Sequence, residues 1–194
     1  MSPLRMAMFG FSLTGNKTRT NAQWVAALES GVPVPVLDFP RPPVCVTLNW
    51  PVRVELNGEV VAECDRVVAV LETTHPPTYY LPPDAFVPGT LQCSTKSRGS
   101  YCEWKGTARY FDLSTTTTKS SSHTVPRVVW SYPEPIDDRF SALAGWYGLY
   151  PGRVSAVYVK GERVTPQQGG FYAGWITSVV EGPFKGDPAH PELI

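Results

Sequence analysis

The chain has 194 residues, and its 17 basic side chains balance 17 acidic ones, so the formal net charge is zero. That length can bury one hydrophobic core without disulfide or metal staples, and the balanced charge gives no reason to expect nucleic acid or a membrane surface as a partner. No apolar run approaches the roughly 18 residues that a membrane-spanning helix needs, while 20 prolines and 16 glycines favour many turns and short strands over a helical bundle.

The first 43 residues are predicted to be an N-terminal extension. A short helix is expected over residues 20–31, where Thr20 or Asn21 can cap its N-terminus and Gly31 can follow its end. Trp24 and Leu28 lie four residues apart and form an apolar stripe on it. Five prolines follow within thirteen residues, which predicts an extended connector. The N-terminus fits a secretory signal poorly, an organelle transit segment stays open, and the cytoplasm is the expected location.

Residues 44–187 are predicted to form a single mainly β domain, with 188–194 as a tail. Alternating apolar and polar residues predict several strands. Asn-Gly at 57–58 strongly favours a tight hairpin turn between two of them, and Lys-Gly at 160–161 favours a second one. The expected architecture is therefore antiparallel.

Two further segments of this domain differ from the strands. Residues 114–123 are rich in serine and threonine, and they are expected to form a mobile hairpin tip or insertion because they have little apolar surface to bury. Residues 137–148 are predicted to form the one packed helix of the domain. An aspartate can cap it, and Phe140, Leu143 and Tyr147 would share its buried face.

The cysteines and histidines are scattered and form no recognisable metal-binding pattern. The sequence contains no CxxC and no HxxxH. We therefore expect no metal and no cofactor. Free, partly buried thiols are the simplest prediction for the four cysteines, and one or two disulfides are the alternative. The residues concerned are Cys45, Cys64, Cys93, Cys102, His75, His123 and His190.

Five phrases along the chain are distinctive: ETTHPPTYYLPP (72–83), CEWKGTARY (102–110), WSYPEP (130–135), YVKGERVTPQQGGFYAGWIT (158–177) and GPFKG (182–186). Together they resemble the DUF427 family, a domain of unknown function also filed as nucleotidyltransferase-like, over about residues 50–187. The resemblance implies a small β-rich domain of the β-tent or open-barrel kind and no particular activity. The Ser/Thr-rich segment looks longer than the family's hairpin, and the first 43 residues lie outside the resemblance.

The first candidate site is the proline-rich phrase around His75. Paired prolines fix the backbone and give a rigid platform for side chains. Glu72, His75 and Tyr79 could supply acid–base and hydrogen-bonding groups to a ligand, with Tyr80 as an aromatic wall. The alternative is a stiff corner whose tyrosines only close the core.

The second candidate is the pair Cys102 and Lys105. A nearby ammonium can lower the pKa of a thiol and make it nucleophilic. Positions three apart on a strand face opposite ways, so a turn after Cys102 is needed to bring the two together. Binding of an anion by Lys105 is favoured over nucleophilic attack by Cys102, for which a plain buried thiol is the simpler interpretation.

The third candidate combines aromatic residues from two phrases. Trp130 and Tyr132 lie two apart on one strand face and could form a pocket wall or simply part of the core. In the glycine-rich phrase at 161–186, paired glycines permit close approach of a backbone or a ligand. One lip of a pocket would then come from Arg163, Gln167, Tyr172 and Trp175, and the alternative is a segment that closes the sheet.

The motifs of several enzyme classes are missing. The sequence contains no GxxxxGK[ST] phosphate loop, no GxSxG and no HExxH, and its Asp137-Asp138 pair suits a helix cap better than Mg²⁺. The leading hypothesis is a domain that binds a small anionic or polar ligand in an aromatic-lined concave site, with catalysis left open. A non-enzymatic protein-interaction module and a nucleotidyltransferase-like or thiol-dependent enzyme are the alternatives.

Overall fold

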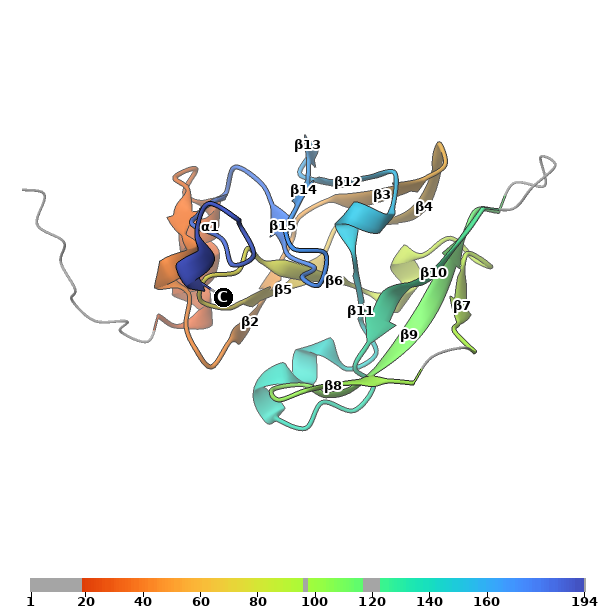
Figure 1. Ribbon diagram of the computed structural model, residues 1–194, viewed down its shortest axis with the longest axis horizontal. Helices are drawn as coiled ribbons and strands as arrows, with labels where there is room; N and C mark the ends of the chain where they lie inside the picture. The colour runs from red at the N-terminus through yellow and green to blue at the C-terminus, as the bar shows by residue number, and fades with distance from the viewer. Residues whose placement is uncertain (1–18, 96–97, 117–122, 194) are drawn as a thin grey trace, which may run out of the picture.

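An antiparallel eight-stranded sheet forms the centre of the fold in the computed structural model, which describes residues 19–95, 98–116 and 123–193 (Figure 1). All of its neighbouring strands run antiparallel. In sheet order the strands are β2 (Val44–Leu48), β5 (Val67–Leu71), β6 (Thr78–Leu81), β11 (Tyr147–Leu149), β10 (Thr124–Ser131), β9 (Gly106–Ser114) and β7 (Leu91–Cys93), with β8 (Ser100–Cys102) paired to β9.

A smaller, four-stranded antiparallel sheet lies beside the large one. Two two-stranded pairs complete the β structure, and no sheet of the described residues closes into a barrel. The small sheet has the order β13 (Glu162–Arg163), β12 (Ala156–Val159), β3 (Val52–Leu56) and β4 (Glu59–Cys64), and the pairs are β1 (Val34–Pro35) with β16 (Val180–Glu181) and β14 (Thr165–Pro166) with β15 (Trp175–Ile176). The predicted mainly β, antiparallel fold is therefore confirmed.

Both predicted hairpins form where the sequence places them. Asn57 and Gly58 have φ of +50° and +81° between β3 and β4, and Lys160 and Gly161 have +52° and +79° between β12 and β13. Two successive positive φ angles are the requirement of the type I′ turn, which is why these dipeptides suit it.

The predicted N-terminal helix is α1 (Asn21–Glu29), and its boundaries follow from its caps. Thr20 and Gln23 form a capping box, and Gly31 follows the end with φ +77°. Trp24 and Leu28 are buried in the same hydrophobic core as the strands, so α1 packs directly onto the β structure, next to β2.

The predicted helix over residues 137–148 is wrong in type and length. Asp137 caps a short 3-10 helix, η3 (Asp138–Leu143), and Gly145 then turns the chain with φ +73°. Tyr147 begins strand β11, which pairs with both β6 and β10 in the middle of the large sheet. Two rows of inter-strand hydrogen bonds outweigh the helical pattern of the apolar residues there.

The Ser/Thr-rich segment is described only at its two ends. Thr115 donates its backbone N–H to the carbonyl of His123, 3.0 Å away, which extends the hairpin of β9 and β10. The prediction of a mobile tip falls on residues 117–122, which lie outside the described residues. Residues 1–18, where a transit segment stays open, also lie outside them.

The large sheet buries both of its faces. One face packs with α1 and the small sheet into the main core, and the other packs with η3 into a smaller cluster. Alternation on β6 makes this clear, since Tyr79 and Leu81 belong to the main core and Tyr80 to the smaller cluster. No helix within the described part of the chain is long and apolar enough to cross a membrane.

The remaining short helices are single 3-10 turns, three in connections and one near the C-terminus. They are η1 (Val36–Asp38), η2 (Pro83–Ala85), η4 (Pro151–Arg153) and η5 (Pro191–Leu193).

Candidate functional site

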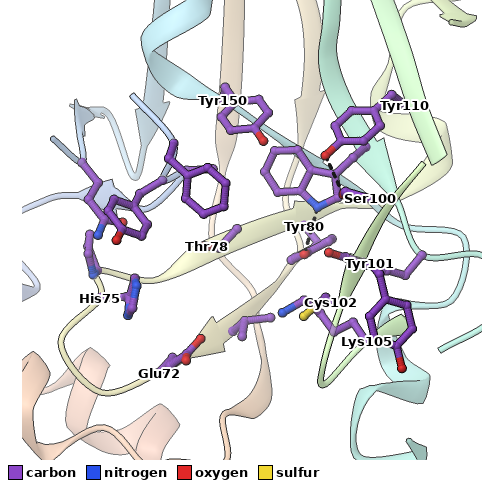
Figure 2. Close-up of a pocket in the computed structure, with 18 residues that line it drawn as sticks. Glu72, His75, Thr78, Tyr80, Ser100, Tyr101, Cys102, Lys105, Tyr110 and Tyr150 are labelled. Atoms are coloured by element: carbon purple, nitrogen blue, oxygen red, sulfur yellow. Dashed lines mark hydrogen bonds between the residues drawn. The ribbon is translucent and has the colours of Figure 1, made fainter. Parts of the chain in front are cut away.

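A pocket of about 350 Å³ opens on the face of the large sheet that carries the smaller cluster (Figure 2). Its wall is formed by β5, β6, β8, β9 and β10 together with the loops at 72–77 and 167–173. Nine of the residues that the sequence suggested line this pocket: Glu72, His75, Tyr80, Cys102, Lys105, Trp130, Tyr132, Gln167 and Tyr172.

Three suggested residues lie elsewhere. Tyr79 follows the alternation of β6 into the main core, where its ring lies 5.2 Å from that of Trp175. Trp175 is fully buried there and donates its indole N–H to the carbonyl of Leu149. Arg163 lies on the small sheet and donates to the carbonyl of Ser155, away from the pocket. None of the three can contact a ligand in the pocket.

Lys105 is the most unusual residue of the site. Only 9% of its surface is exposed. Its ammonium nitrogen lies 5.6 Å from the ring centre of Tyr132 and 5.5 Å from that of Phe140. Among the described residues no carboxylate forms an ion pair with it and no group accepts a hydrogen bond from it. Figure 2 shows the side chain reaching from one side towards the middle of the pocket.

The turn between β8 and β9 brings Cys102 and Lys105 to the same pocket. Cys102 pairs with Gly106, so the three residues between them form a tight turn. Their side chains therefore do not alternate between the two faces of the sheet as they would on a strand. Gly106 has φ +86°, and a Cβ there would come within 2.7 Å of Ile136. A glycine is therefore required to end the turn.

The indole of Trp130 lies across strand β11 and closes one side of the pocket. It donates its N–H to the hydroxyl of Tyr80 at 3.1 Å, and the two rings meet edge to face. A Cβ on Gly148 would lie 2.5 Å from the indole. The indole of Trp130 can therefore occupy this position only because residue 148 is a glycine and has no Cβ.

Phenolic hydroxyls supply most of the polar groups in the aromatic walls. Burial raises the pKa of Tyr80 and Tyr132 well above the ordinary value, and that of Tyr150 to about 12. These phenols are therefore neutral at physiological pH and can each donate a hydrogen bond. Tyr110 already shares one with Ser100, at 2.8 Å.

His75 faces Lys105 from the opposite side of the pocket (Figure 2). Its Nδ1 lies 3.0 Å from the carbonyl oxygen of Thr73, and because a carbonyl only accepts, Nδ1 carries the proton. Burial lowers the pKa of the imidazole, which the bond to Thr73 only partly offsets. The ring is therefore neutral near pH 7, with the lone pair on Nε2, and it packs edge-on against Tyr172 at 5.4 Å.

Glu72 is paired within the protein. Arg41 donates to its carboxylate at 2.7 Å and to that of Glu103 at 3.0 Å. The guanidinium also lies 5.7 Å from the ring of Trp104. Arg41 thus links Glu72, which lines the pocket, to Glu103 in the turn between β8 and β9, and its single positive charge is shared between the two carboxylates.

Residues 45–160 match the family profile described as a domain of unknown function, DUF427. The chain belongs to the DUF427 family. A search of curated proteins found no match to the chain. The matched part of the DUF427 domain contains both walls that carry Lys105 and His75, and it ends before the glycine-rich segment.

Gln167 lines the pocket of this DUF427 domain, but both ends of its side-chain amide are hydrogen-bonded within the protein. Its Nε2 donates to the carbonyl of Lys185 at 2.8 Å, and its Oε1 accepts the N–H of Gly174 at 3.2 Å. A Cβ on Gly174 would meet that oxygen at 2.4 Å and Pro76 at 2.5 Å. The glycine-rich segment is therefore held close to the proline-rich loop, and Gln167 positions it.

Several lining residues of the DUF427 domain were missed from the sequence. Phe171 and Tyr101 stand at the pocket with 80% and 71% of their surface exposed. Tyr110 could have been found, because it shares a strand face with Ala108. Tyr150 could not, since it reaches the pocket only because residues 147–149 form a strand in place of the expected helix.

Two further features of the described residues concern possible metal ligands and the four cysteine thiols. Within the described residues, no group of three or more His, Cys, Asp or Glu side chains is placed to hold a metal ion. All four cysteines are free, and three of them are at least partly buried as predicted, whereas Cys93 is exposed. Burial raises the pKa of Cys45 to about 12 and that of Cys64 to about 11. Those two thiols are therefore poor nucleophiles at neutral pH.

Proposed function

We propose that the protein binds a small molecule with an anionic or strongly polar group, which lies against the ammonium of Lys105. The observation that carries the proposal is the buried, unpaired Lys105 at the wall of an aromatic pocket. A buried charge without a hydrogen-bonding partner is costly, and faces of aromatic rings compensate for only part of that cost. A ligand oxygen would supply the missing partner, in a place where charge-assisted hydrogen bonds are strong.

The walls favour a planar ligand. Tyr80, Trp130 and Tyr132 present rings and a few phenolic hydroxyls, which is the mixture of apolar surface and sparse polar groups that small-molecule sites have. His75 adds a lone pair on Nε2 opposite the ammonium. The preferred ligand therefore has a flat ring with an oxyanion or carbonyl at one edge and a hydrogen-bond donor at another.

Calorimetry and thermal unfolding test this proposal with Lys105→Met and a matched control. Lys160→Met makes the same change at a lysine that also lies over an aromatic ring, 4.8 Å from Trp50, but outside the pocket. Wild-type protein is screened against aromatic carboxylates, nucleobases and sugars. A ligand present at about a hundred times its Kd should add about 2.7 kcal/mol to the free energy of unfolding.

The two variants decide how the result is interpreted. We expect the binder to lose about tenfold or more in affinity with Lys105→Met, because a charge-assisted hydrogen bond contributes about 1.5–3 kcal/mol, and to bind Lys160→Met like the wild type. Equal binding to Lys105→Met and the wild type would contradict the proposal. So would the absence of any stabilising compound in a screen that covers these classes.

A thiol-dependent reaction is the second candidate, favoured by the presence of Cys102 in the same pocket as Lys105 and His75. It predicts that iodoacetamide at pH 7 modifies Cys102 faster than the exposed Cys93. Peptide mapping by mass spectrometry measures both rates in one sample. If Cys93 reacts first, Cys102 is an ordinary wall residue and this function is rejected.

A further inference from the structure

A second hollow, of about 290 Å³, adjoins the pocket. The two share Tyr110, Tyr150 and Phe171, so a ligand can extend from one into the other across these rings. Figure 2 shows Tyr110 and Tyr150 side by side at one end of the pocket. Beyond them lie two guanidinium groups, those of Arg127 and Arg153, which we call the arginine shelf.

We propose that the arginine shelf binds a phosphate group, and that the ligand of the pocket is therefore a phosphorylated compound with a planar ring. This inference rests on the proposed function, because the ring would occupy the pocket beside Lys105. The shelf would hold the phosphate outside, with Tyr110, Tyr150 and Phe171 between the two ends of the ligand.

The backbone of β10 is irregular where it presents Arg127. Its pairing with β9 shifts register between Val125 and Val129, and Arg127 has φ +51°, an uncommon conformation for a residue other than glycine. Its N–H donates to the carboxylate of Asp112 at 2.8 Å. Bulges of this kind redirect a side chain, and this one turns Arg127 towards the hollow.

Arg153 holds the bulge in place from the other side. Its guanidinium donates to the carbonyls of Arg127 at 3.0 Å and Pro126 at 2.7 Å. It also lies 5.7 Å from the ring centre of Tyr150. Arg153 therefore positions Arg127 and adds a second positive charge to the shelf.

The guanidinium of Arg127 is left available for a ligand. It stacks over Tyr110 at 4.5 Å, and within the described residues it makes no ion pair and no hydrogen bond. The carboxylate of Asp112 accepts the backbone N–H of Arg127 and forms no ion pair with its guanidinium. The guanidinium group is planar, and its fork of N–H donors suits two oxygens of a phosphate better than a single point charge would.

NMR of the arginine side chains tests the shelf directly, with inorganic phosphate as the probe and acetate at equal ionic strength as the comparison. We expect the Nε–H signal of Arg127 to shift with phosphate until it saturates. The affinity for acetate from the same titration should be at least about tenfold lower. Arg127→Gln should abolish saturable binding. Arg53→Gln is the matched control, because Arg53 also stacks on a tyrosine, Tyr158, but lies on the small sheet.

Phenyl phosphate then tests the link between the two hollows. It should bind about tenfold or more tightly than inorganic phosphate, because its ring enters the pocket while its phosphate stays on the shelf. Arg127→Gln should weaken the binding of phenyl phosphate about tenfold or more. Equal affinities of phenyl phosphate and inorganic phosphate would overturn the ligand class.

The outcomes separate this inference from the proposed function. If pocket ligands bind in a Lys105-dependent way but phosphate leaves the Arg127 signal unmoved, the shelf is rejected and the pocket stands. The same holds if phosphate moves the Nε–H signal of Arg153 equally in the wild type and in Arg127→Gln. If phosphate binds the shelf while no compound engages the pocket, the proposed function fails instead.

Discussion

Substitution of Gly148 by alanine should damage the pocket through Trp130. The new Cβ would lie 2.5 and 2.6 Å from two atoms of the indole, and Trp130 has little room to withdraw, since its ring meets those of Tyr80 and Tyr150. Overpacking of this kind costs about 1–3 kcal/mol, and loss of the bond from the indole to Tyr80 leaves a buried donor unpaired at about 1–3 kcal/mol more.

Together these costs come to about 2–6 kcal/mol. Because alanine recovers about 1 kcal/mol by restricting the unfolded chain, the expected net loss in the free energy of unfolding is about 1–5 kcal/mol. Urea denaturation followed by circular dichroism measures it. The decisive comparison is a double-mutant cycle with Trp130→Phe, whose smaller ring leaves space for the Cβ, so that Gly148→Ala should cost less than about 1 kcal/mol in that background. Equal costs in both backgrounds would refute the contact.

Three further predictions follow from burial. Because burial lowers the pKa of His75, the unfolded chain binds a proton before the folded protein does, so the free energy of unfolding should fall as the pH drops below about 6.5. His75→Gln should flatten that fall relative to the wild type, and an equal fall in the variant and the wild type would contradict this account. Trp24→Ala should cost about 3–5 kcal/mol in urea denaturation, since Trp24 is 2% exposed in the main core; a loss below about 1 kcal/mol would mean that α1 is dispensable. Tyr79→Phe should leave stability unchanged or raise it by about 1 kcal/mol, because the Tyr79 hydroxyl is buried without a hydrogen-bond partner, and a clear loss would reveal an unseen partner.

The local features of the fold could be predicted from the sequence because short-range chemistry decides them. The turns at 57–58 and 160–161 require positive φ, and the dipeptides there tolerate it. Helix α1 follows from its capping box. Residues 137–148 were predicted wrongly because the strand at 147–149 is stabilised by β6 and β10, which are distant in sequence. Non-local pairing of this kind leaves little trace in a local pattern.

The site was predictable where alternation and backbone stiffness decide the direction of a side chain. The proline-rich phrase and β8–β9 turn supplied His75 and Lys105, both of which line the pocket. The choice between Tyr79 and Tyr80 could not be made, because both faces of β6 are buried and hydrophobicity does not distinguish them. The arginine shelf could not be predicted from the sequence either, because it depends on non-local features. These are a bulge in β10 and a contact from Arg153, which lies in a later turn.

The central claim is that a ligand binds at Lys105, and NMR of the lysine side chains tests it most directly. Protein with ¹³C-labelled lysine is titrated with each compound that raises its melting temperature, and the Cε signals of Lys105 and Lys160 are followed together. Because the ligand's oxygen would contact the ammonium of Lys105, the Cε signal of Lys105 should shift in proportion to the fraction of protein bound. The Cε signal of Lys160, which lies over Trp50 and outside the pocket, should stay fixed. A stabilising ligand that saturates without moving the Lys105 signal would contradict the account.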